Sequence, residues 1–258
     1  MGKKRILLVG ESWVSSAIHY KGFDQFGSVT YHTGADALTA ALEGSEFELQ
    51  HLPAHLAPEQ LPFTLDALDD YAAVLLSDIG ADSMLLHPDV WSRGKTVPNR
   101  LKLLRDWTER GGNLAMFGGY MSFQGIDGKG RWHRTPVEQA LPVECLPYDD
   151  RLEVPEGFTL QVVDSYRNHE IFQGILGPWP VLLGANEVVM KPGAEVLARL
   201  PVEQGGYPLL VTGAFGAGRS LAWMSDISPH WLPQSFSDWP GYRILFLNML
   251  RWLTDANR

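Results

Sequence analysis

Three uninterrupted apolar runs constrain the fold of this chain more than any other feature. They are RILLVG at residues 5–10, AAVLLSD at residues 72–78 and NLAMFG at residues 113–118, and each ends on glycine or a polar residue. Runs of this kind, without polar alternation, are typical of strands buried on both faces. We therefore expect a parallel sheet whose central strands are covered on two sides.

The segments between these runs have the patterns of helices and a further strand. Residues 34–44 and 98–112 place Ala, Leu or Trp at helical spacing and finish in glycine, and FELQHL at residues 47–52 fits a strand. Alternation of strand and helix predicts the α/β class with a doubly wound parallel sheet.

The second half of the chain changes character after residue 135. Short alternating segments separated by Pro and Gly predict an antiparallel β extension, in which GAFGAGRS at residues 213–220 forms a hairpin turn. Residues 241–255 predict a last helix, apolar almost all round and packed against the sheet. No repeat or long linker interrupts the chain, so we expect residues 1–258 to form a single domain.

Charge and cysteine content exclude several functions. A formal net charge of -9 would repel a phosphate backbone, so we expect no nucleic-acid partner. The apolar run after the basic start MGKKR is too short for a signal peptide or a membrane span, which predicts no membrane association. Cys145 is the only cysteine, so the chain can form neither an intrachain disulfide nor a Cys-based zinc site, and we expect a location in the reducing cytoplasm.

The predicted strand ends are the candidate ligand site, because open α/β sheets bind ligands beyond the carboxyl ends of their parallel strands. Polar residues at such positions equally fit helix caps and turns, but three such segments together favour a cleft. We expect the amides that follow the glycine pair to face this cleft as a site for an anion or a carbonyl group. The candidate ligand-binding residues are Glu11, Ser12, Asp78, Gly118, Gly119, Tyr120 and Met121.

SDISPHW at residues 225–231 follows the apolar strand RSLAWM and is expected at the same edge of the sheet. His230 is then a candidate acid or base, because imidazole titrates near neutrality and the carboxylate of Asp226 can fix its tautomer. The alternative is an inert histidine packed beside Pro229 and Trp231.

The stretch NLAMFGGYMSFQG at residues 113–125 has the form of a strand, a tight glycine turn and the start of a helix. Some enzymes use such an elbow to present a Ser or Cys nucleophile. Here the top of the bend holds Tyr120 or Met121. Ser122 lies one or two residues beyond, where it either replaces the nucleophile, with His230 as its base, or caps the following turn.

Five segments, taken in order, carry a resemblance to a known family: LLVGES, AVLLSDIGA, GGNLAMFGGYMSFQG, GRWHRTPVEQALPVE and GAFGAGRSLAWMSDISPHW. They resemble the class I glutamine amidotransferase-like proteins, and within them a bacterial cytoplasmic branch related to trehalose-utilisation proteins. The resemblance covers nearly the whole chain and implies a flavodoxin-like fold. It also implies an elbow Cys that releases ammonia from glutamine through a thioester, assisted by a later His and an acidic residue.

This chain departs from that family pattern at the residues that would carry the chemistry. The elbow lacks a thiol, and His230 is followed by Trp231 where the family has Pro-Glu. Cys145 lies in PVECLPY, distant from the elbow in sequence, where a buried and inert thiol is expected. We therefore expect no glutaminase activity.

Two further segments bear on ligands. GKGRWHRT at residues 128–135 either folds over the cleft as a lid, with Trp132 offering an apolar face to the ligand, or forms an exposed loop or subunit contact. His51 and His55 flank Pro53, which prevents the regular helix that would align them on a metal ion. The sequence predicts no metal site and no cofactor.

Three functions fit these observations. The first is an amidotransferase-like protein without the nucleophilic Cys that binds or processes a small polar metabolite. The second is a hydrolase that uses Ser122 and His230, with Asp226 as the acidic partner. The third is a non-catalytic assembly or regulatory module. Nine Trp residues and the aromatic segment SFSDWPGYR at residues 235–243 suggest that such a module forms a homo-oligomer.

Overall fold

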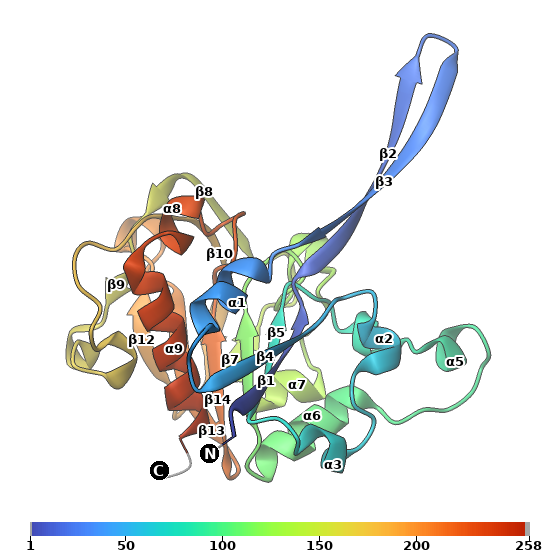
Figure 1. Cartoon of the computed structure of the whole chain (residues 1–258). Coiled ribbons are helices and arrows are strands. Elements are labelled where there is room, and N and C mark those ends of the chain that lie inside the picture. Colours follow the sequence, from blue (N-terminus) through green and yellow to red (C-terminus); the bar gives the residue numbers. More distant parts are fainter. Residues whose placement is uncertain (1, 256–258) are drawn as a thin grey trace.

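An eight-stranded sheet forms the centre of the molecule in the computed structural model, which describes residues 2–255 (Figure 1). Five neighbouring strands run parallel; in spatial order they are β4 (Phe47–Leu52), β1 (Lys4–Gly10), β5 (Ala73–Ser77), β6 (Asn113–Phe117) and β14 (Gly218–Trp223). Three antiparallel strands continue the sheet: β13 (Pro208–Phe215), β12 (Glu195–Arg199) and β9 (Gln161–Val162). The α/β class, the flavodoxin-like parallel sheet and its antiparallel extension are confirmed.

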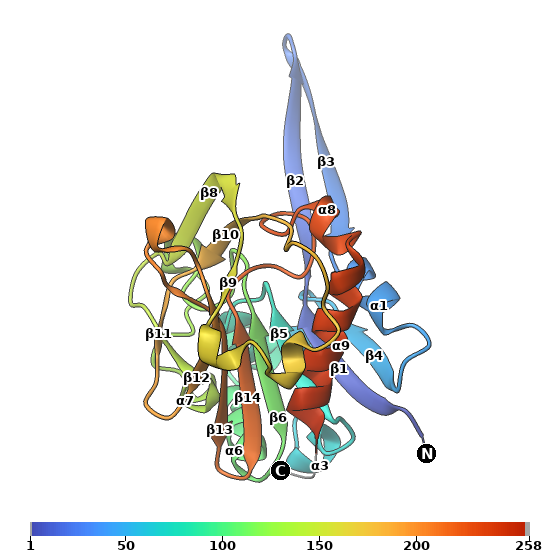
Figure 2. The same ribbon diagram turned by 90° about the vertical axis from the view of Figure 1, so that its left-hand side faces the viewer.

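The central strands are buried because helices pack on both faces of the sheet. All five residues of β5 are buried, as are the last five of β1, which explains their unbroken apolar sequences. Helices α1 and α9 pack together on one face, and α6 and α7 pack together on the other (Figures 1 and 2). The helices are α1 (Asp36–Leu42), α2 (Ala57–Gln60), α3 (Leu65–Leu68), α4 (Asp82–Leu85), α5 (Pro88–Trp91), α6 (Arg100–Glu109), α7 (Pro136–Ala140), α8 (Gln234–Ser237) and α9 (Pro240–Thr254).

Three pairs of antiparallel strands lie outside the central sheet. Two of them pack on the body: β8 (Arg151–Phe158) with β10 (Leu182–Asn186), and β7 (Val143–Cys145) with β11 (Val188–Met190). The third is a long hairpin of β2 (Ser12–Lys21) and β3 (Asp24–Thr33), which extends away from the body (Figure 1). This hairpin is not among the elements expected from the sequence.

The aromatic segment at residues 235–243 does not form the surface that the sequence suggested. Phe236 and Tyr242 are buried, and the partly buried Trp239 packs against Phe236 and Trp179. These rings belong to the core of the chain itself, beneath α8 and at the start of α9. A separate finding concerns membranes: within residues 2–255, no helix is long and apolar enough to cross a bilayer.

Candidate functional site

A cavity of about 530 Å³ lies where the parallel strands end. Its walls come from the loops that follow β1, β5, β6 and β14, as expected for an open α/β sheet. The structure thus brings together residues that are more than 200 positions apart in the chain. The lining residues are Glu11, Trp13, Asp78, Tyr120, Met121, Ile126, Asp226, Ser228, Pro229 and His230.

Glu11 follows β1 directly and adopts a left-handed backbone conformation with φ 49°. Its side chain is buried and accepts two short hydrogen bonds, from Ser77 Oγ at 2.6 Å and from Ser228 Oγ at 2.7 Å. Burial, together with the nearby charge of Asp226, raises the pKa of Glu11 to about 7. This carboxyl group therefore exchanges its proton near neutral pH.

Asp78 occupies the equivalent position after β5 and has a left-handed backbone as well, with φ 42°. Its Oδ1 accepts a hydrogen bond of 2.7 Å from the amide of Met121. Burial raises the pKa of Asp78 to about 6, although this hydrogen bond favours the ionised form. Two carboxyl groups with raised pKa values thus line the cavity on non-glycine residues with a costly backbone, a combination that is frequent at functional sites.

The amides that follow the glycine pair are already engaged by side chains of the protein. The amide of Gly119 donates to Asn186 Oδ1 at 3.0 Å, and the amides of Tyr120 and Met121 donate to Asp78. The expectation that the amides after Gly118 and Gly119 face the cleft as an anion site is therefore wrong. The carboxylate of Asp78 occupies the position that an oxyanion would need.

Gly119 is required for this arrangement. Its φ of 136° is one that other residues rarely adopt, and an added Cβ would lie 2.8 Å from Asp78 Oδ1 and 3.0 Å from Asp226 Oδ1. Gly118 is equally crowded, since a Cβ there would lie 2.2 Å from the carbonyl oxygen of Met224. The glycine pair thus lets β6 end in close contact with the loops after β5 and β14.

Ser122 is not placed as a nucleophile. It is buried, does not line the cavity, and accepts a hydrogen bond of 3.0 Å from the amide of Asp78 through its Oγ. No α-helix begins at this point either: an irregular turn follows β6 and leads to a single 3₁₀ turn at Ile126–Gly128. Both the strand-to-helix elbow and a reactive Ser122 are contradicted by this geometry.

His230 and Asp226 form a direct pair on the loop after β14. His230 Nδ1 lies 2.8 Å from Asp226 Oδ2, and the His230 side chain is 40% exposed whereas that of Asp226 is 7% exposed. Partial burial lowers the pKa of His230, but the hydrogen bond to Asp226 and its charge outweigh this effect, so the pKa is raised. Asp226 thereby fixes the tautomer of His230 and leaves its Nε2 available for proton exchange.

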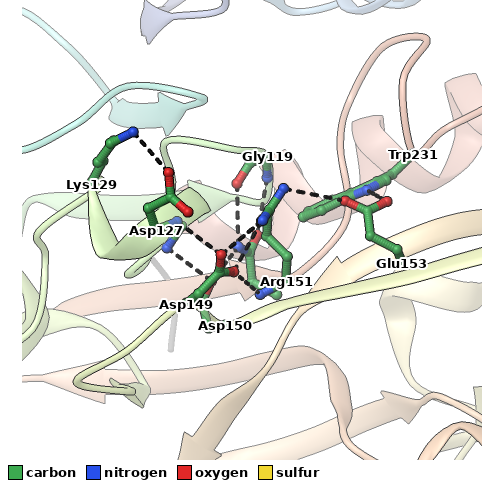
Figure 3. A network of polar contacts seen from close by, with 10 residues as sticks. Gly119, Asp127, Lys129, Asp149, Asp150, Arg151, Glu153 and Trp231 are labelled. Atoms are coloured by element: carbon green, nitrogen blue, oxygen red, sulfur yellow. Dashed lines mark hydrogen bonds and ion pairs between the residues drawn. The ribbon is translucent and has the colours of Figure 1, made fainter.

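Tyr120 contacts His230 edge-on, with a distance of 4.2 Å between ring centroids. The guanidinium of Arg151 lies 5.0 Å from the Tyr120 ring centroid. Figure 3 shows how Arg151 is held: it binds Asp149 at 2.8 Å and approaches Glu153 at 3.8 Å, and Glu153 in turn accepts a hydrogen bond from Trp231 Nε1. This network supports the Tyr120 side of the cavity.

The buried carboxyl group of Asp150 secures the turn after β6. Asp150 accepts hydrogen bonds from the amides of Gln124 and Gly125 and from Asn186 Nδ2, at 2.7 to 2.9 Å. Asn186 also accepts from and donates to the backbone of Gly119. These bonds connect the turn to β8 and β10 and give it a fixed shape.

Two other candidate residues, Trp132 and Ser12, are engaged in hydrogen bonds within the protein. Trp132 is fully buried, and its Nε1 donates to the carbonyl oxygens of Ile79 and Met121, so it is not the apolar face of a lid. Ser12 begins β2 next to Glu11, but its Oγ accepts a hydrogen bond from the amide of Ala54 and does not line the cavity.

Sequence reasoning missed part of the cavity wall. Trp13, Ile126 and Ser228 line it but were not among the expected residues. Ser228 lies within SDISPHW, a segment already expected at this edge, whereas Trp13 belongs to the hairpin that was not predicted. Within residues 2–255, no three His, Cys, Asp or Glu side chains are grouped so that they could hold a metal ion.

Comparisons with known proteins agree with the fold. The sequence model of the family described as "Putative glutamine amidotransferase" matches residues 5–255. Two solved structures from Salmonella typhimurium, the cytoplasmic proteins STM3548 and STM1381, are 36% and 37% identical to the chain. Both superpose with a TM-score of 0.90 over 96% of this chain, and over 98% and 99% of theirs.

A more distant likeness shows the fold alone. A ThuA-like protein from Parabacteroides merdae is 13% identical, with a TM-score of 0.55 over 99% of this chain and 91% of its own. No curated protein sequence matches the chain. The family match over nearly all residues, and two relatives above 35% identity, settle the membership that the sequence motifs suggested. The chain belongs to the glutamine amidotransferase-like family.

Proposed function

We propose that the protein binds a small uncharged or cationic molecule, bearing hydroxyl or amino groups, in the cavity at the strand ends. We further propose that it processes this molecule by proton transfer and without a thioester. The observation that carries the proposal is the His230–Asp226 pair, which lines the same cavity as Glu11 and Asp78, two carboxyl groups with raised pKa values. Groups with such pKa values in one cavity are typical of acid–base sites.

The charge of the cavity selects against anionic ligands. Among the described residues that line it, three are acidic and none is Lys or Arg. A carboxylate or phosphate would meet the charges of Asp78 and Asp226, and it would find the turn amides already bound to Asp78. Hydroxyl and ammonium groups, by contrast, can donate hydrogen bonds to these carboxylates.

The remaining wall suits the carbon skeleton of such a ligand. Trp13, Tyr120, Met121 and Ile126 offer apolar and aromatic surface beside the carboxyl groups. A cavity of about 530 Å³ falls within the range of small-molecule sites, which combine mostly apolar walls with a few placed polar groups.

His230 is the group that we assign to proton transfer. Because Asp226 accepts the Nδ1 proton, Nε2 is the nitrogen that takes a proton from, or returns it to, a ligand hydroxyl or amine. Glu11 and Asp78, with pKa values of about 7 and about 6, can supply or accept the second proton near neutral pH.

The absence of a cysteine from the cavity supports chemistry without a thioester. Cys145 is buried on β7, and burial raises the pKa of its thiol well above the usual value. We propose a cytoplasmic location as well, because both Salmonella relatives are described as cytoplasmic proteins and the single Cys145 leaves no intrachain disulfide.

The proposal is tested by thermal shift, because a ligand that binds the folded state raises the melting temperature. Sugars, amino sugars and amino alcohols should raise it, whereas glutamate, citrate and phosphate should not. The shift should be lost in His230→Gln and kept in the control His55→Gln, which changes an exposed histidine outside this cavity. A response to anions alone, equal shifts in both variants, or no response at all would overturn the proposal.

A further inference from the structure

The hairpin of β2 and β3 is an arm whose apolar face is uncovered along most of its length, while at its base Tyr31 contacts the ring of His55. Its strands pair in register from Ser12 with Thr33 to Lys21 with Asp24, and neither pairs with a third strand among the residues that the structure describes. The arm stands clear of the body in both views (Figures 1 and 2). A two-stranded hairpin in water is marginally stable at best, so an arm of this length needs a further surface to pack against.

The register separates the side chains of the arm into two unlike faces, because successive residues of a strand point to opposite sides. One face carries the stacked pairs of Trp13 with His32 and of His19 with Phe26, among Ser and Thr residues. The other face, which we call the apolar arm face, presents Val14, Ile18, Tyr20, Val29 and Tyr31.

The apolar arm face is large enough for a stable protein interface. Its five side chains are between 48% and 73% exposed, and Phe23 at the tip is fully exposed. With about 200 Å² for a fully exposed aromatic side chain and less for Val and Ile, the five side chains and Phe23 together expose apolar surface on the order of 700 Å². A standard interface buries about 800 Å² on each partner. The arm therefore offers nearly one complete half of an interface.

The charge and the open edges of the arm decide what can cover this face. Lys21 and Asp24 are the only charged residues of residues 12–33, so the arm has no basic patch for nucleic acid or anionic lipid. Both strands have edges with unpaired backbone groups, which cannot enter the hydrocarbon of a membrane. A protein surface can cover this face, because its binding requires no basic patch and leaves the strand edges open to water.

We propose that the apolar arm face binds the same face of a second copy of this chain. In a two-fold dimer one surface patch serves both copies, so the two arms would stack as ribbons with their apolar faces together. The bodies carry the net charge of -9 and repel each other, whereas the neutral arms allow contact away from them. The interface thus lies on the arm and not on residues 235–243.

The arm is also joined to the cavity at its base. Glu11 lines the cavity directly before β2, and Trp13 lines it from the strand itself while stacking on His32 at 5.1 Å between ring centroids. A dimer formed through the arms would therefore fix the position of β2, the strand that contributes Trp13 to the cavity wall.

Sedimentation velocity and light scattering on the full chain at micromolar concentration test this proposal. The wild type should have twice the 28.7 kDa mass of one chain. Ile18→Lys places two like charges across the two-fold axis and should weaken the dimer about a hundredfold. Ala17→Lys is the matched control, because it adds the same charge to the opposite face and should leave the dimer intact.

Circular dichroism should show that both variants fold like the wild type, since both positions are exposed. A monomeric wild type would overturn the proposal, as would equal behaviour of the two variants. Flotation with uncharged phosphatidylcholine vesicles provides a separate check. Flotation of the wild type with these vesicles, lost in Ile18→Lys, would assign the face to a membrane and reject the dimer.

Discussion

Asp226 Oδ2 lies 2.8 Å from His230 Nδ1 and accepts a second hydrogen bond, of 2.7 Å, from the amide of Trp231. The carboxylate is thus fixed by the backbone and in turn fixes the imidazole ring. This relationship allows His230 to act in a defined tautomer although its side chain is partly exposed to solvent.

We expect Asp226→Asn to lower the pKa of His230. The hydrogen bond and charge of Asp226 raise this pKa against the opposing effect of partial burial. In the variant the burial remains and is opposed only by the smaller effects of the Glu153 and Asp78 charges. Because the pKa of His230 is raised on folding, the pairing contributes its full stability when the pH is below the ordinary value of 6.5. This contribution is lost as the pH rises through the raised pKa. NMR titration of the His230 ring measures the change, with the His19 resonances as an internal control. An unchanged His230 titration would contradict the pairing.

Glu11→Gln should stabilise the protein at neutral and alkaline pH. The pKa of Glu11 rises from 4.5 to about 7 on folding, so between these values the unfolded state loses a proton that the folded state keeps. Stability therefore falls as the pH rises through this window, by up to about 3 kcal/mol. Glutamine avoids this loss and can still hydrogen-bond to Ser77 and Ser228.

Urea unfolding at pH 8 and at pH 4.5 measures this effect. The Glu11→Gln variant should gain about 1 to 3 kcal/mol over the wild type at pH 8, and much less at pH 4.5. Glu59→Gln, on the exposed side of α2, is the control and should show no such pH dependence. An equal gain at both pH values would mean that the Glu11 carboxyl group is not responsible.

The sheet and the position of the cavity were predictable because they depend on local patterns. Unbroken apolar runs such as residues 6–9 are required wherever a strand is covered on both faces, and parallel strands necessarily end at one edge. Glu11 and Asp78 follow such strands directly, and His230 lies on the loop after a third, so their common location follows from topology.

The contacts within the site were not predictable, because they depend on partners from distant elements. The amide of Gly119 is engaged by Asn186, which lies 67 positions away on β10. The burial of Trp132 likewise depends on carbonyl groups from two other loops. The arm did have a local signal, since Val14, Ile18 and Tyr20 alternate with small or polar residues up to the turn at Gly22. These apolar side chains remain exposed and do not pack into the core of this chain.

A cysteine placed at residue 121 should be unreactive. In Met121→Cys the backbone amide would still bind Asp78, and the carboxylates of Asp78 and Asp226 would disfavour a thiolate. We expect alkylation by iodoacetamide to be about tenfold slower than for a free cysteine. Adding Asp78→Asn should accelerate it. The buried Cys145 should contribute little background, which the wild type measures directly. Rapid alkylation of Met121→Cys alone would show an elbow that is ready to activate a nucleophile.

Gly34→Ala should disable the site from a position that does not line the cavity. Gly34 follows the arm, and a Cβ at this residue would lie 2.2 Å from Glu11 Oε1 and 2.3 Å from Ser228 Oγ. Glu11 would have to give up its hydrogen bond to Ser228, which leaves a buried carboxyl group with one partner fewer. We expect a loss of about 2 to 4 kcal/mol in the free energy of unfolding, together with loss of any ligand-induced thermal shift. Gly2→Ala is the control, because among the described residues its added Cβ would have no neighbouring heavy atom within 4 Å. If both variants unfold at the wild-type denaturant concentration, then the packing of Gly34 against Glu11 does not hold this carboxyl group in place.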